Sequence, residues 1–137
     1  EEVILKIKAL PYSGAGDEAY LVYRQAVSSG REEIADAWYR LGMAIYDAGY
    51  FRQAKTSFYF AMKYGSEKEA FISNVWLGHM YDLEGNRSKA LEYYHKAMEA
   101  WDGKPYMHSQ YNMTVDKSWV EQRLEKPFAR EEKLTWN

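Results

Sequence analysis

The segment WYRLGMAIYDAGYFRQAKTSFYFA, residues 38–61, decides the fold of this chain of 137 residues. Its pattern returns after a constant interval of 36 residues, as the steps from 41 to 77, from 49 to 85 and from 54 to 90 show. The matching positions are Leu41, Gly42, Gly49, Ala54, Phe58 and Ala61 in the first copy, and Leu77, Gly78, Gly85, Ala90, Tyr94 and Ala97 in the second. A fixed interval of this size is typical of stacked helical repeats. We therefore predict an all-α fold built from repeated pairs of helices.

The composition is that of a soluble globular domain, with 47% hydrophobic and 28% charged residues. A formal net charge of −2 leaves no basic excess to neutralise phosphates, so we expect no nucleic-acid partner. The chain has no Cys, which excludes disulfides, zinc-thiolate sites and thiol catalysis. No apolar run approaches the roughly 18 residues of a membrane span, so none is expected. The sequence leaves the compartment open, and the cytoplasm is our expectation.

Capping residues, Gly and Pro mark the expected helix boundaries. Residues 1–10 are expected to form a short helix that Pro11 ends, and Asp17 to cap a second helix. The pairs Ser29/Glu32 and Ser66/Glu69 have the spacing of capping boxes, each of which would open the first helix of a repeat. The remaining expected boundaries are Gly49 and Gly85 as helix ends, Asn86 and Asp116 as caps, and Lys126-Pro127 as the last stop.

These boundaries divide the chain into a repeat domain and a C-terminal extension. The repeat domain, residues 1–103, would contain three units at about 1–30, 31–66 and 67–103. The extension, residues 104–137, begins with a stretch of little periodicity, 104–116, and has one short helix near 117–125. The final residues are expected to be frayed, or docked only by Phe128 and Trp136.

Two glycines in the middle of predicted helices point to close packing. Gly42 and Gly78 each cost about 1 kcal/mol relative to Ala at a helix interior, which is tolerable where a neighbouring helix must come near. We expect Ala54 and Ala90 to face these glycines. We also expect Phe58 and Tyr94 to fill the space between one helix pair and the next.

These residues resemble the tetratricopeptide repeat (TPR) family, whose pattern is Trp-x2-Leu-Gly-x2-Tyr followed by Ala-x3-Phe. The positions that carry the resemblance, and that it assigns to repeat packing, are Trp38, Leu41, Gly42, Ala54, Phe58, Ala61, Leu77, Gly78, Tyr81, Ala90, Tyr94 and Ala97. The chain departs from the pattern at Ile45, where Tyr is usual, and at Asn74, where Trp is usual, and it lacks the boundary Pro. The resemblance implies a right-handed α-superhelix of about three antiparallel helix pairs plus a C-terminal capping helix.

The family usually binds a peptide or protein segment in its concave groove, which the first helix of each pair lines. The register then assigns the groove to Asp36, Tyr39, Met43, Tyr46, Asp47, Ile72, Val75, His79 and Asp82. This acidic and aromatic set lacks the Lys and Asn of a carboxylate clamp, and favours a ligand with apolar anchors and some positive charge.

Two other interpretations of these groove positions stay open. Their apolar members are at the spacing of ordinary core residues. The chain's own tail would also be able to fill the groove, through Tyr106, Met107, Tyr111 and Met113.

No catalytic, metal or cofactor motif is visible. His95 has Glu92 and Glu99 one turn away, which is more typical of a solvated helix face than of a metal site. The GNRSKA sequence at residues 85–90 has one Gly and lacks the Gly-Lys-Ser/Thr ending of a phosphate loop, so we interpret it as a turn between helices. We therefore expect no enzyme, no metal and no cofactor.

The sequence favours a non-catalytic protein–protein interaction scaffold or adaptor. A self-association module that forms homo-oligomers is the main alternative, because a short array has two unprotected ends and the chain is 17% aromatic. An accessory TPR domain of a larger protein is a third, which the absence of an initial Met allows. Nothing in the sequence identifies the partner.

Overall fold

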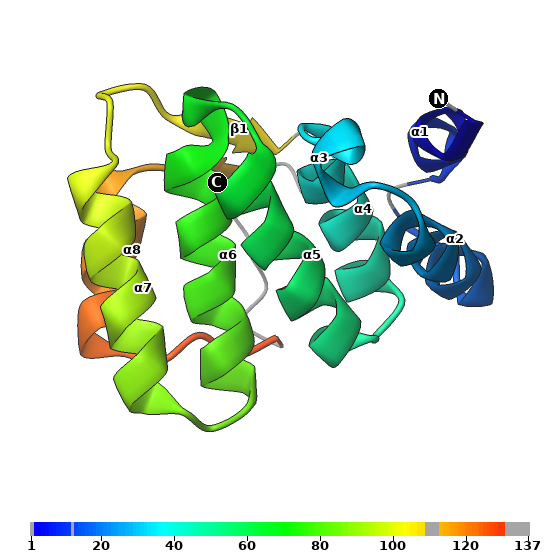
Figure 1. Ribbon diagram of the computed structural model, residues 1–137. Coiled ribbons are helices and arrows are strands. Elements are labelled where there is room, and N and C mark those ends of the chain that lie inside the picture. The colour runs from blue at the N-terminus through cyan, green and yellow to red at the C-terminus, as the bar shows by residue number, and fades with distance from the viewer. Residues whose placement is uncertain (1, 12, 109–112, 131–137) are drawn as a thin grey trace. The chain divides into compact units, whose positions relative to one another are not determined.

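Figure 1 shows the computed structural model, which describes residues 2–11, 13–108 and 113–130. Helices account for most of these residues, so the predicted all-α class is confirmed. The chain divides into two compact units, residues 1–69 and residues 70–137. Among the described residues, no helix has the length and apolarity needed to cross a membrane.

The first unit begins with two helices that flank a longer helical pair. Its elements are α1 (Glu2–Ala9), α2 (Asp17–Ser28), α3 (Arg31–Ile34), α4 (Ala37–Asp47), α5 (Phe51–Tyr64) and the 3-10 turn η1 (Glu67–Glu69). Helices α4 and α5 pack on each other, and α1 and α2 pack on α4. The Arg40 guanidinium of α4 donates to the carbonyls of Lys8 and Leu10, at 2.9 and 3.2 Å. A cationic donor at the C-terminal end of α1 satisfies carbonyls that the helix itself leaves unpaired.

The predicted cap at Asp17 is wrong. Helix α2 begins at Asp17 itself, after Gly16, and no side chain caps it. The Asp17 carboxylate instead accepts a hydrogen bond from the Tyr50 hydroxyl. Tyr50 precedes α5, so this acid connects two helices instead of ending one.

Both predicted capping boxes are also wrong. The Ser29 hydroxyl donates to the carbonyl of Gln25, one turn back in α2, and α3 starts after Gly30 without a side-chain cap. Ala35, at φ 40°, then breaks the helix that we expected to continue into Trp38. At the second box, the backbone N–H of Ser66 donates to an acid outside the motif, Asp36.

The predicted glycine ends of α4 and α6 are confirmed. Gly49 has φ 94°, its N–H donates to the carbonyl of Tyr46, and the next N–H, that of Tyr50, donates to the carbonyl of Ile45. This pair of reversed bonds is the Schellman arrangement, which needs a residue that tolerates positive φ. The same two bonds recur around Gly85, at the equivalent position of the second copy.

The second unit contains α6 (Ala70–Leu83), α7 (Arg87–Glu99), the strands β1 (Tyr106–His108) and β2 (Met113–Val115), and α8 (Lys117–Glu125). The predicted caps are confirmed: Asn86 accepts from the N–H of Lys89, and Asp116 from that of Trp119. The expectation of an irregular 104–116 stretch is wrong, because β1 and β2 pair antiparallel. Three-residue strands are too short for an alternating pattern to reveal them.

Each mid-helix glycine lies under an aromatic ring of its own helix pair. A Cβ atom at Gly42 would lie 2.7 Å from the Phe58 ring, and one at Gly78 would overlap the Tyr94 ring. Close approach at these glycines is therefore as predicted. The approaching group is a ring of the paired helix, and not the Ala54 or Ala90 that we expected. Of the predicted packing residues Tyr81 is half-buried, and the others are buried.

Candidate functional site

The predicted groove residues of the first unit all make contacts inside that unit. Tyr39, Met43 and Tyr46 are buried in α4, with the Tyr39 ring 5.8 Å from that of Phe58. The two acids are more exposed and accept backbone N–H groups: Asp36 from Ser66 at 2.8 Å, and Asp47 from Gly14 at 3.0 Å. Partner binding by these five residues stays a prediction.

The predicted groove residues of the second unit lie on α6 and are also buried. Ile72, Val75 and His79 have no exposed surface, and the Asp82 side chain is 1% exposed. His79 and Asp82 contact the end of the chain. We name the surface made by Trp76, His79, Asp82 and Arg87 the α6–α7 face, and residues 116–128 the C-terminal segment.

The imidazole of His79 lies among four aromatic rings, those of Trp76, Tyr94, Trp119 and Phe128. Its Nε2 accepts a hydrogen bond from the indole N–H of Trp119, at 3.2 Å, so that nitrogen is unprotonated. The Phe128 ring stacks on the imidazole with centroids 3.9 Å apart, and the Trp76 ring meets its edge at 4.5 Å. The predicted docking of Phe128 is therefore confirmed, and Trp136 lies outside the described residues.

The carboxylate of Asp82 collects donors from α7 and from the C-terminal segment. Arg87 Nη1 donates to both oxygens at 3.0 Å, the Tyr94 hydroxyl donates at 2.7 Å, and the backbone N–H of Phe128 at 2.9 Å. Burial, followed by the hydrogen bond and charge of Asp82, raises the pKa of Tyr94 well above its ordinary value. Tyr94 therefore remains a hydroxyl donor, and Arg87 forms an ion pair with Asp82 at 3.0 Å.

The α6–α7 face contacts the C-terminal segment in two ways. Asp82 accepts a backbone N–H, and Arg87 donates from Nη2 to the backbone carbonyl of Arg123. Every amino acid has a backbone carbonyl, and all but Pro have a backbone N–H. These two bonds therefore do not depend on which side chains the bound segment carries. The side-chain contacts come from Trp119 and Phe128, the two aromatic anchors. The α6–α7 face therefore contacts the C-terminal segment through two backbone groups and two aromatic side chains.

The sequence pointed to part of this arrangement. It assigned His79 and Asp82 to polar contacts, but it missed Arg87, which belongs to the segment interpreted as a turn. The alternative in which the tail fills a groove named other residues. Met107 is 71% exposed and does not dock. Of the others, Tyr106 is half-buried, whereas Tyr111 and the side chain of Met113 lie outside the described part of the chain.

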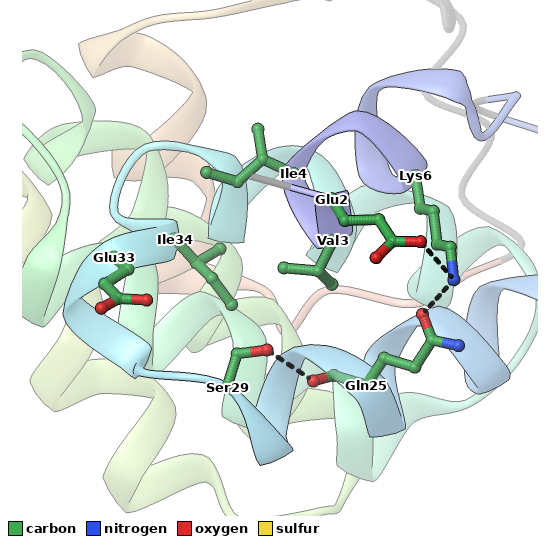
Figure 2. Close-up of a pocket in the computed structure, with 8 residues that line it drawn as sticks. All are labelled: Glu2, Val3, Ile4, Lys6, Gln25, Ser29, Glu33 and Ile34. Carbon is green, nitrogen blue, oxygen red and sulfur yellow. Dashed lines mark hydrogen bonds and ion pairs between the residues drawn. The ribbon is translucent and has the colours of Figure 1, made fainter.

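A separate cavity of about 450 Å³ lies among α1, α2 and α3 in the first unit. Figure 2 shows the side chains of Val3 and Ile34 directed toward each other across it. Lys6 on its rim already bonds the Gln25 side chain at 3.1 Å and lies 4.0 Å from Glu2. These rim groups are exposed and bond one another, so the cavity offers no buried polar group to select a ligand.

Within residues 2–11, 13–108 and 113–130, no group of three or more potential ligand side chains is placed to hold a metal ion. His95 is exposed, and the neighbouring Glu92 lies 3.6 Å from Lys89 and 3.5 Å from Lys96. Comparison of the chain with protein-family models, with curated proteins and with solved structures found no match.

Proposed function

We propose that this chain is a non-catalytic helical-repeat scaffold of the tetratricopeptide type, which binds a segment of another protein on its α6–α7 face. The repeat part of the proposal is supported by the pairs α4–α5 and α6–α7. Each pair carries a glycine under an aromatic ring, and the first helix of each ends in the same glycine motif. The same packing arrangement, repeated at a constant interval in the sequence, is typical of repeat proteins.

The binding part of the proposal is carried by one observation. Asp82 and Arg87 hold the C-terminal segment through backbone atoms of Phe128 and Arg123. A surface that pairs with main-chain groups accepts many sequences, and its specificity then comes from the pockets for anchor side chains. We therefore expect a partner segment that carries two aromatic residues at the spacing of Trp119 and Phe128.

Displacement of the chain's own segment would not strand a buried charge. Without the N–H of Phe128, Asp82 still has Arg87 and the Tyr94 hydroxyl as donors. An acid that lost all its partners would make an empty face very costly. Because Asp82 keeps two partners from its own unit, the cost of an empty face is mainly the exposure of the apolar rings.

A synthetic peptide tests this proposal directly. Residues 116–130, labelled with a fluorophore, would be titrated with the full chain carrying Phe128→Ala, which weakens its own segment. We expect saturable binding by fluorescence anisotropy, and binding about tenfold or more weaker for a peptide that lacks Trp119 or Phe128. Glu125→Ala, a change of an exposed residue in the same region, is the matched control. The chain with this change should bind the labelled peptide as weakly as the wild-type chain, whose own segment occupies the face.

A second experiment uses the wild-type chain. A benzophenone group at the position of Phe128 in the peptide should cross-link to α6 of the wild-type chain at high peptide concentration, close to Trp76 and His79. Unlabelled peptide should suppress the cross-link. If the Phe128→Ala chain keeps its helical circular dichroism and still does not bind the peptide, the proposal is wrong.

Self-association is a second candidate function, because another copy of this chain supplies the same C-terminal segment. Leu5 and Leu21, in α1 and α2, are also 68% and 53% exposed, so both side chains are accessible to a second copy. Light scattering across a concentration series separates the candidates. A stable dimer that Phe128→Ala or Leu21→Lys disrupts would favour self-association, whereas a monomer at all concentrations would favour a foreign partner.

A further inference from the structure

The turn between α5 and α6 holds a carboxyl group in an unusual place. Glu69 is the last residue of η1, and Ala70 opens α6 directly after it. The Oε1 atom of Glu69 is buried and has no hydrogen-bond partner among the described residues. It lies above Gly65, 3.1 Å from the point where a Cβ would stand on that residue. A buried acceptor without a donor favours the uncharged form of the acid.

A second carboxylate faces the same turn. Asp36, in the corner between α3 and α4, accepts the backbone N–H of Ser66 at 2.8 Å. This hydrogen bond places the Asp36 carboxylate beside the turn. Asp36 is exposed, and so are the other charged side chains of α3, α5 and the turn that the structure describes: Glu32, Glu33, Arg52, Lys63, Glu67 and Lys68, with Lys55 half-buried. The charge that acts on Glu69 is that of Asp36.

These two features have the same effect on the acid. Burial first, and then the negative charge of Asp36, raise the pKa of Glu69 from 4.5 to about 7. The group therefore changes charge close to neutral pH, where an ordinary glutamate is fully ionised.

We propose that the η1 turn is a pH-sensitive switch. When Glu69 is protonated, its side chain stays packed over Gly65, and the turn is closed by the hydrogen bond from the N–H of Glu69 to the carbonyl of Ser66, at 3.0 Å. When Glu69 is ionised, it faces the Asp36 carboxylate, and its side chain turns out into water. The turn that leads into α6 then loses its packing and loosens.

The direction of the change follows from what each acid would lose. Asp36 would give up its hydrogen bond to the Ser66 N–H if it moved, whereas the buried Oε1 of Glu69 has no hydrogen bond to give up within the described structure. Glu69 is also only partly buried, so water is near. Repulsion between the two carboxylates is therefore relieved by Glu69.

The experiment is a titration of the full chain by NMR, from about pH 5 to about pH 9, the range around an acid shifted to neutrality. The carboxyl carbon of Glu69 and the amide of Ser66 should titrate together, with a midpoint of about 7. Hydrogen exchange at Glu69 should be faster above the midpoint than base catalysis alone explains. Asp36→Asn should lower the midpoint, because the repelling charge is gone while burial remains.

Two variants of the same turn give the matched comparison. Glu69→Gln should abolish the Ser66 transition, and Glu67→Gln, which changes an exposed acid two residues away, should leave it in place. A carboxyl of Glu69 in the wild-type chain that titrates below about pH 5 overturns the proposal, since that is the ordinary range of glutamate. A Ser66 transition that persists in Glu69→Gln also overturns it.

Discussion

The ring of Phe128 stacks on the imidazole of His79, with centroids 3.9 Å apart and the planes 13° from parallel. The backbone N–H of the same residue donates to Asp82, one turn further along α6. A single residue near the end of the described chain thus supplies both an aromatic and a main-chain contact to α6. This residue is where the candidate site can be tested most directly.

Replacement of Phe128 by Ala should destabilise the second unit by about 3 kcal/mol, the lower part of the range for buried Phe→Ala changes. The side chain is 3% exposed and contacts both His79 and Trp76. The backbone bond to Asp82 remains available in the variant, so the loss comes from packing. Urea unfolding followed by tryptophan fluorescence measures the change. Glu125→Ala, on the exposed side of α8, should change the free energy of unfolding by less than about 0.5 kcal/mol.

Replacement of Gly42 by Ala should destabilise the first unit by about 1–3 kcal/mol, although Ala favours helix by about 1 kcal/mol. The new methyl group would lie 2.7 Å from the Phe58 ring, which is itself fully buried, so one of the two must shift within the core. Thermal unfolding of Gly42→Ala, Phe58→Leu and the double variant measures the coupling. The smaller Leu should recover part of the loss in the double variant, and strictly additive effects would show that the clash is not the cause.

The interval in the sequence predicted this glycine but not its neighbour. Spacing within one helix shows which residues share a face, whereas the residue that meets Gly42 depends on how α4 and α5 are rotated against each other. For the same reason, some predictions of helix caps were confirmed and others were wrong. Asn86 and Asp116 cap their own helices locally, whereas Asp17 and Ser66 are engaged by Tyr50 and Asp36 from distant parts of the chain.

At the candidate site too, the sequence predicted which residues share a helix face but not their contacts with distant segments. The register placed His79 and Asp82 on one helix face, because that follows from the period of a helix. The sequence could not show that Trp119, 40 residues later, donates to His79, since no periodic pattern joins the two segments. Arg87 was missed because a residue after a turn is judged by its local neighbours, and its contacts are with Asp82 and the distant Arg123.

Replacement of Glu69 by Gln should stabilise the first unit above about pH 7 and have little effect near pH 4.5. The folded pKa is raised, so between these values the folded state holds a proton that the unfolded state has released. Stability therefore falls as the pH rises through this window, and stays lower above it. Glu69 is partly exposed, so solvent screening reduces the difference to about 1 kcal/mol. Urea unfolding of both proteins across the window measures it, and parallel curves would contradict the assignment.

Replacement of Arg40 by Met should release the end of α1 while the pairing of α4 with α5 persists. The guanidinium donates to the carbonyls of Lys8 and Leu10, so its loss leaves these groups without their charged donor. Met keeps an apolar stem of similar length, and the effect is then about 1.5–3 kcal/mol, the range of hydrogen bonds to charged groups. Hydrogen exchange should become faster in α1 and remain slow in α5. Lys8→Met removes a neighbouring exposed charge and should leave both rates unchanged; equal acceleration across the first unit in Arg40→Met would instead indicate global destabilisation.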